Sequence, residues 1–194
     1  MMNISAEEQQ DIRNRSHKPM MYLAIVAMCM FFGGLTSAYI VSSGGPNWLR
    51  FELPQMFYTS TAIIVLSSLT MWWAYASAKK DNFTSISLGT SLTLLLGLAF
   101  VVCQILAWQA LNEKGIFFGG STSTQAGSFL FAIIYIGHLG HLAGGIIMLI
   151  YVCIKSFRKS YHSKNLLGLQ LSSIYWHFLD LLWIYLFLFI YFTH

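Results

Sequence analysis

The chain has 194 residues, of which 56% are hydrophobic and only 9% are charged, and its formal net charge is +4. A water-soluble domain carries about a quarter charged residues, because its surface has to be solvated. The composition therefore excludes a soluble globular protein and predicts an integral membrane protein. The positive charge does not indicate nucleic-acid binding, since the basic residues lie between apolar segments, where membrane topology accounts for them.

Five apolar segments are each long enough to cross a hydrocarbon core of about 30 Å as a helix that rises about 1.5 Å per residue. In chain order they cover residues 20–41, 55–78, 86–111, 126–154 and 171–192. Pro19 and Pro54 precede the first two segments, and proline is well placed in the first turn of a helix. No alternating strand pattern of a membrane barrel is visible. The predicted fold class is all-α, an integral membrane bundle of five transmembrane helices.

The connections between these segments carry unequal numbers of basic residues. Nine of the eleven Lys and Arg residues lie in the N-terminal tail, the second loop and the fourth loop, which share one side, and Arg50 and Lys114 lie on the other. Basic loops stay in the cytoplasm. We therefore expect a cytoplasmic N-terminus and a periplasmic C-terminus. The predicted organisation is a cytoplasmic tail over residues 1–18 and a five-helix transmembrane domain over residues 19–194.

Polar residues inside the last two segments are candidates for chemistry. Asp180 is the acidic residue inside a predicted span, and a carboxylate there has to be paired, protonated or in contact with water. His177 lies one turn earlier on nearly the same helix face, and Trp176 belongs to the same stripe. In the fourth segment His138 and His141 are also one turn apart. These five residues could form a polar network between the fourth and fifth spans.

Two other interpretations of this set remain open. One is a haem held by a histidine from each helix. Against it, His138 and His141 are too close in sequence to hold opposite faces of one haem, and no second well-placed pair exists. The other is a proton path through Asp180 and the histidines, although such a path usually needs more polar side chains across the membrane.

Small residues mark faces where helices could approach closely, as in small-xxx-small motifs. We expect helix packing at Gly33, Gly34, Gly137, Gly140, Gly144 and Gly145. The three cysteines are far apart and predict neither a disulfide framework nor a zinc site. Nucleophile–base pairs, phosphate loops and metal-spaced carboxylates are not visible. The residues alone therefore suggest no catalytic, cofactor-binding or metal-binding residue.

The last segment resembles a known family. Residues 175–183, YWHFLDLLW, resemble the YWHFvDvvW signature of subunit III of haem-copper respiratory oxidases. His138, His141, Gly144 and Gly145 look like the HxxHxxGG part of the family's GxHxxHxxGG helix. Further matches run in order along the chain: Gly34 to Tyr39, Leu53-Pro54, Thr61, Ser67-Ser68, Gln104, Trp108, Leu111 and Gly115. The resemblance covers residues 19–192 and fits the short bacterial form with five spans.

The resemblance implies a redox-inert accessory subunit of a cytochrome c oxidase in the bacterial inner membrane, with no cofactor of its own. Haems and copper are expected in partner subunits, subunits I and II, and structural phospholipids in a cleft between helix groups. The chain would support proton uptake and sustained oxygen reduction, and a larger respiratory supercomplex is a further partner to consider. The five polar residues would then be a structural network. The alternatives are subunit III of a quinol oxidase and a small membrane transporter.

One position departs from the family pattern. Many members carry a Ser-Glu pair in the first span, and alignment from Ala38 and Tyr39 places that Glu at Met28. A thioether takes the place of a carboxylate. A role that rests on that buried acid is therefore not expected to carry over to this chain, whereas the fold is.

Overall fold

The computed structural model describes residues 6–45, 53–114, 125–161 and 166–193. Over these residues the backbone is helical apart from short turns, and no strand occurs. The elements are α1 (Ala6–Ser43), α2 (Gln55–Ala78), α3 (Phe83–Glu113), α4 (Gln125–Leu130), the π-helix η1 (Phe131–Leu139), α5 (Gly140–Phe157) and α6 (Leu167–Thr193). The prediction of an all-α fold is confirmed.

The described part of the chain has five helical segments long and apolar enough to cross a membrane. They are Ser16–Ser43, Gln55–Ala78, Phe83–Glu113, Gly127–Phe157 and Leu167–Thr193. The second has the predicted bounds, and the others contain the predicted segments almost entirely. The fourth consists of α4, η1 and α5, which follow one another without a break. The chain is thus a multi-pass membrane protein with a five-helix bundle.

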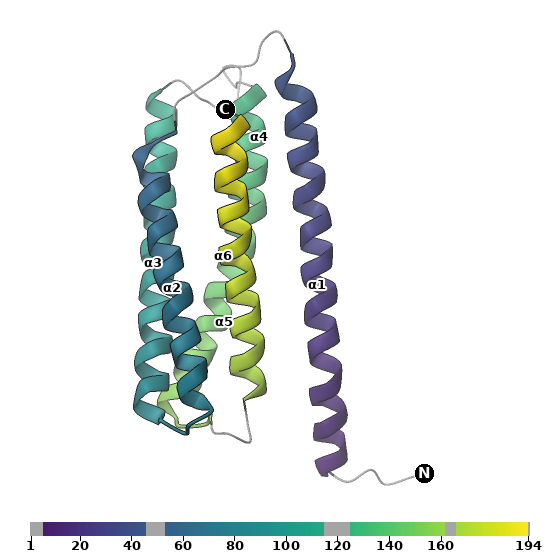
Figure 1. The fold of residues 1–194 in the computed structure, drawn as a ribbon, viewed down its shortest axis with the longest axis vertical. Coiled ribbons are helices and arrows are strands. Elements are labelled where there is room, and N and C mark those ends of the chain that lie inside the picture. The colour runs from purple at the N-terminus through teal and green to yellow at the C-terminus, as the bar shows by residue number, and fades with distance from the viewer. Residues whose placement is uncertain (1–5, 46–52, 115–124, 162–165, 194) are drawn as a thin grey trace.

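The helices stand nearly parallel (Figure 1). The turn between α2 and α3, the end of α5 and the beginnings of α6 and α1 lie at one end of the bundle. The end of α6 lies at the opposite end, as an odd number of crossings requires. α2 and α3 form the most closely packed pair, α6 packs against α2 and α5, and α1 packs against α6, η1 and α4.

The prediction that Pro19 opens the first helix is wrong. α1 begins at Ala6 and continues through Pro19. Residues 6–18 contain several Glu, Gln and Arg residues, which favour helix. Proline removes one backbone hydrogen bond and here the helix continues on both sides of it. The assignment of residues 1–18 to a cytoplasmic tail stays a prediction, with residues 6–18 helical.

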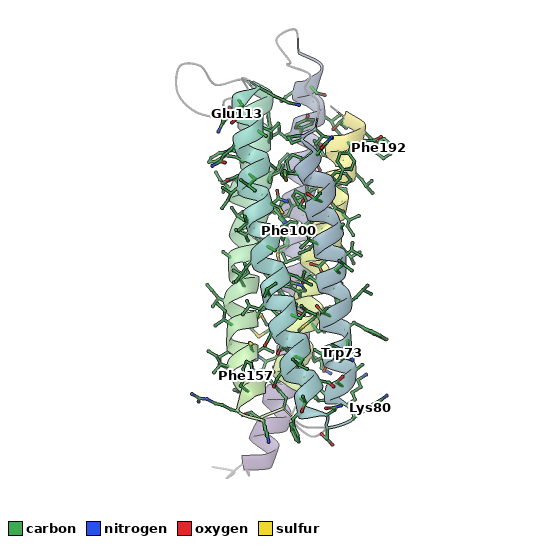
Figure 2. The ribbon with its side chains drawn as sticks, turned by 90° about the vertical axis from the view of Figure 1, so that its left-hand side faces the viewer. Trp73, Lys80, Phe100, Glu113, Phe157 and Phe192 are labelled. Atoms are coloured by element: carbon green, nitrogen blue, oxygen red, sulfur yellow. The ribbon has the colours of Figure 1, made fainter. Side chains whose placement is uncertain are left out.

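Aromatic side chains fill the interior, while aliphatic and aromatic side chains also cover the outside. Trp176, Trp183 and Phe100 are at most 1% exposed. Phe157 and Phe192, by contrast, are 65% and 77% exposed, and Phe192 points away from the bundle in Figure 2. An apolar outer surface of this kind needs lipid as its solvent.

A polar layer between α2, α3 and α6

Hydroxyl groups on α2 hold the two buried tryptophans of α6. The indole N–H of Trp183 donates to Thr61 Oγ1 over 3.0 Å, and that of Trp176 donates to Ser67 Oγ over 3.0 Å. A buried indole N–H needs an acceptor, because water is not available to it. The two bonds therefore fix the register of α6 against α2 along its inner face.

The same face of α2 is joined to α3 by a second set of bonds. The Ser67 hydroxyl donates to the carbonyl of Thr93 over 3.3 Å, and the hydroxyls of Thr70 and Thr93 lie 2.8 Å apart. Further toward the other end, Gln104 Nε2 donates to Ser60 Oγ over 3.1 Å. Interhelical hydrogen bonds of this kind stabilise helix association in lipid, where hydrophobic burial contributes little. Side chains of α2 thus form hydrogen bonds with both α3 and α6.

Asp180 lies in a recess on the outer side of this layer. It is 3% exposed, and neither carboxyl oxygen has a hydrogen-bond partner among the described residues. The Ser68 hydroxyl, which lies beside this carboxyl group, is 2.6 Å from His177 Nδ1. The recess has a volume of about 290 Å³ and is lined by Val65, Ser68, Leu69, His177, Asp180, Leu181 and Ile184.

The position of this recess determines what can reach it. Asp180 is midway along α6, and Leu69 and Leu181 at the rim are 58% and 66% exposed. The recess therefore opens sideways, toward the hydrocarbon core, and not toward either water phase. A carboxyl group at this depth is costly unless a donor or a proton satisfies it.

His138 and His141 contact different parts of the bundle. His138 is 2% exposed and packs against the rings of Trp183 and Phe100, with centroids 5.3 and 6.1 Å away, and neither ring nitrogen has a hydrogen-bond partner within the described part of the chain. His141 Nδ1 lies 2.6 Å from the carbonyl of Gly137 in its own span. The π-helix ends between the two histidines. They face no common ligand site, and a shared polar network of all five predicted residues stays a prediction.

The predicted glycines differ in their surroundings. A Cβ at Gly145 would lie 2.8 Å from Leu179 Cδ1, and one at Gly137 would lie 2.9 Å from Phe32 Cε1, so both allow close helix contact. A Cβ at Gly144 would be in ordinary contact, 3.7 Å from the Tyr175 hydroxyl. No atom lies within 4 Å of a Cβ built at Gly33, Gly34 or Gly140. Packing at these three positions would need a neighbour other than the described residues and stays a prediction.

Two glycines of α3 matter more than the sequence suggested. A Cβ at Gly97 would lie 2.8 Å from Trp176 Cη2, and one at Gly89 would lie 2.7 Å from Ala74 Cβ. Gly89 therefore sets the distance between the backbones of α2 and α3. The short α2–α3 turn was the one feature of the sequence that could have indicated the close contact of Gly89 with Ala74. In a helical hairpin with a tight turn, small residues at similar distances from the turn face one another.

Among the described residues no group of three or more His, Cys, Asp or Glu side chains could hold a metal ion. Cys29, Cys103 and Cys153 are free thiols. Met28, the position at which the resemblance predicts that many family members carry Glu, is 8% exposed within α1. Proton uptake or release at that position is not available to this side chain.

Comparison with known proteins identifies the family. The profile described as Cytochrome c oxidase subunit III matches residues 14–194. The chain is 30% identical over 175 residues to Cytochrome bo(3) ubiquinol oxidase subunit 3 from Pseudomonas aeruginosa, covering 88% of this chain and 81% of that protein. It is 26% identical over 167 residues to Cytochrome c oxidase subunit 3 from Bacillus sp. (strain PS3), covering 84% and 78%. The chain belongs to the cytochrome c oxidase subunit III family, the accessory subunits of haem-copper oxidases.

Proposed function

We propose that the chain is the redox-inert accessory subunit of a haem-copper terminal oxidase in a bacterial inner membrane, with its N-terminus in the cytoplasm. Its partners are subunits I and II, which carry the haems and copper, and membrane phospholipids. It stabilises the catalytic subunit and supports proton uptake and sustained oxygen reduction. The family match over residues 14–194 supports this proposal, and the Asp180 recess is the structural observation that carries it.

The recess supports the proposal of a membrane-embedded partner. Both oxygens of Asp180 are buried without a donor among the described residues, although the recess around them opens sideways between α2 and α6. Lipid tails cannot hydrogen-bond to the polar lining of this recess, Ser68, His177 and Asp180, so a polar side chain from another membrane helix fits it better. Subunit I is the partner of choice because it is the large membrane-embedded subunit of the oxidase.

Replacing Asp180 by alanine is expected to weaken the association with the oxidase. Truncating one side of a buried polar pair costs about 2 kcal/mol or more, because the other side loses its partner. The measurement is the amount of haem-bearing subunit that co-purifies in mild detergent with the tagged chain. Asp180→Asn keeps an acceptor oxygen and should retain more of the partner than Asp180→Ala. Equal co-purification of wild type and both variants would contradict a role for Asp180 in assembly.

Replacing both His138 and His141 by alanine is expected to leave the haem content per assembled complex unchanged. His138 is enclosed by aromatic rings and His141 is bonded to its own backbone, so neither is placed as a ligand. The pyridine haemochrome spectrum, normalised to subunit I, measures the haem content. The loss of one haem per complex would show that the chain carries a redox centre.

The proposed function has two forms, which differ in the electron donor of the oxidase. The relatives include subunit 3 of a cytochrome c oxidase and subunit 3 of a ubiquinol oxidase, with similar identities to the chain. We assign the chain to a cytochrome c oxidase, with a quinol oxidase as the alternative. Mass spectrometry of the co-purified subunit II separates them, since a copper-binding domain there indicates cytochrome c as the donor. A chain that purifies alone and colourless would contradict both.

A further inference from the structure

Three polar side chains meet in the recess between α2 and α6. Ser68 comes from α2, and His177 and Asp180 lie one turn apart on α6. The Ser68 hydroxyl is 2.6 Å from His177 Nδ1 and lies beside the carboxyl group of Asp180. A hydroxyl group donates one hydrogen bond and accepts up to two. Ser68 can therefore connect the acid to the histidine, and the positions of the hydrogens decide the charge of the recess.

An ionised Asp180 would have too few donors around it. A carboxylate offers about four acceptor sites, whereas neither oxygen of Asp180 has a hydrogen-bond partner among the described residues. The Ser68 hydroxyl beside it carries a single hydrogen, for which His177 Nδ1 is a second acceptor. The other described residues of the lining are apolar: Val65, Leu69, Leu181 and Ile184. A carboxylate in such surroundings is costly at this depth in the membrane.

A charged pair of Asp180 and His177 is also unfavourable. His177 is the basic side chain of the described lining, and moving the proton of the acid onto it would place two ions in a recess that opens toward hydrocarbon. Their attraction offsets the lost hydration only where further hydrogen bonds satisfy both groups. The other histidines near α6 cannot assist, because His138 is enclosed by aromatic rings and His141 is bonded to a carbonyl of its own span.

We propose that Asp180 is held as a neutral carboxylic acid, linked through Ser68 to His177, and that the recess is an uncharged site for an amide side chain. The acid O–H donates to Ser68 Oγ, and the Ser68 O–H donates to His177 Nδ1. The neutral imidazole then carries its hydrogen on Nε2. Two groups remain for a neighbour: the carbonyl oxygen of the acid, which accepts, and His177 Nε2–H, which donates. Neither has a hydrogen-bond partner within the described residues.

These two groups determine which side chain fits the recess, and this step rests on the proposed function. The carboxamide of an Asn or Gln on a membrane helix of the partner carries both a donor and an acceptor. A Lys, an Arg or a carboxylate would instead be buried beside a neutral acid, without an opposite charge. Uncharged polar side chains also form hydrogen bonds between membrane helices in general. The recess is thus a site for an amide and not one half of a salt bridge.

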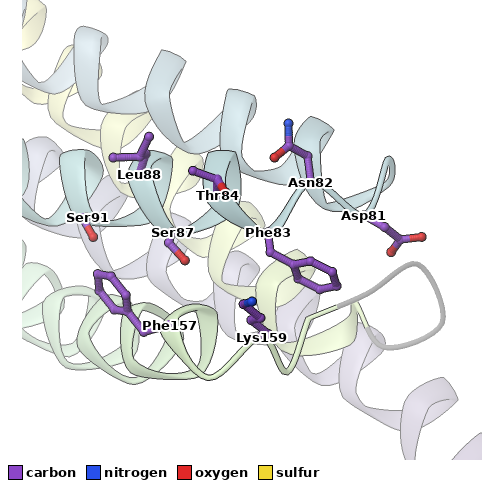
Figure 3. A pocket seen from close by; sticks show the side chains of 9 residues that line it. All are labelled: Asp81, Asn82, Phe83, Thr84, Ser87, Leu88, Ser91, Phe157 and Lys159. Atoms are coloured by element: carbon purple, nitrogen blue, oxygen red, sulfur yellow. The ribbon is translucent and has the colours of Figure 1, made fainter.

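Infrared spectroscopy of the full chain in lipid bilayers at neutral pH tests the protonation state. We expect a carbonyl band of a carboxylic acid that is lost in Asp180→Asn and kept in Asp81→Asn. Asp81 is the matched control, because it is exposed at the α2–α3 turn and its carboxylate points away from Ser87 (Figure 3). Labelling the aspartate carboxyl groups with ¹³C should move the band to lower wavenumber and needs no substitution. A wild-type chain without this band would overturn the proposal.

Two further measurements test the link through Ser68. Ser68→Ala should shift the acid band to higher wavenumber, because the acid loses its hydrogen-bond acceptor. Ser67→Ala is the control, since the Ser67 hydroxyl accepts from Trp176 on the inner face of α2 and should leave the band in place. In ¹⁵N NMR spectra, His177 should have a bare Nδ1 and a protonated Nε2, with its signals identified by their loss in His177→Gln. A doubly protonated His177, or a band that Ser68→Ala leaves unchanged, would contradict the link.

Co-purification with the oxidase separates this proposal from the proposed function. A partner that contributes an amide should remain with Asp180→Asn nearly as it does with wild type, because the variant is also neutral and keeps an acceptor. A cationic partner would be lost from Asp180→Asn as it is from Asp180→Ala, and that result would overturn the uncharged site. If the wild-type chain purifies without partner subunits, the proposed function fails, whereas the infrared band of the chain alone still decides the state of Asp180.

Discussion

Replacing Trp176 by alanine is expected to lower the free energy of unfolding by about 3–5 kcal/mol, the usual cost of truncating a buried tryptophan. The ring is 1% exposed and fills the space that Gly97 on α3 and Gly145 on α5 leave open. Its removal also leaves Ser67 without the indole donor. The variant therefore loses contacts between α6 and three other helices at once.

Thermal unfolding of the purified chain in mild detergent measures this effect. Trp72→Ala is the matched control, because Trp72 is 64% exposed on the outer face of α2. A change at that position should stay within about 0.5 kcal/mol. Similar losses at Trp176 and Trp72 would mean that the interior of the bundle is not packed as described.

Replacing Gly89 by leucine is expected to separate α2 from α3 and to destabilise the bundle by about 1–3 kcal/mol, the range for overpacking. Already the Cβ would lie 2.7 Å from Ala74 Cβ, 3.1 Å from Ala74 Cα and 3.2 Å from the carbonyl of Thr70. Two of these atoms belong to the backbone, so a change of rotamer cannot relieve the contact. The helices themselves have to move.

Gly140→Leu is the control for this substitution, because no atom lies within 4 Å of a Cβ at Gly140. Melting temperatures of the two variants in the same detergent give the comparison. A Gly140 variant that melts lower than the Gly89 variant would contradict the packing of α2 on α3. Preserved melting in both variants would show that the α2–α3 contact is not tight.

The membrane spans could be predicted from the sequence because lipid imposes a simple rule on it. A segment in hydrocarbon has to be apolar over a fixed length and has to satisfy its own backbone groups. α2 has the predicted bounds for this reason. Outside the lipid this rule does not apply. There the helix propensity of residues 6–18 favoured a helix that begins early, whereas Pro19 favoured one that begins at the proline. In the structure α1 includes both residues 6–18 and Pro19.

The buried face of α6 could also be predicted from the sequence, whereas the residues that contact this face could not. Regular spacing placed Trp176 and Asp180 on one face, and both are buried. Their surroundings depend on α2, which lies more than a hundred residues earlier in the chain, as the Trp176–Ser67 bond shows. Periodicity describes one helix at a time and contains no information on which helices pair. The sequence of α2 alone therefore does not show that its hydroxyls accept hydrogen bonds from the indoles of α6.

The π-helix in the fourth span changes which residues of that span share a face. Each i→i+5 bond of η1 encloses one residue more than a bond of an ordinary α-helix. A helical wheel started at Gln125 is therefore out of phase by the time it reaches Gly145, and assigns it to the wrong neighbour. For the same reason, deleting one residue from η1 could convert it to regular α-helix. A deletion within α5 would instead rotate the residues between the deletion and the nearer end of the span relative to the neighbouring helices.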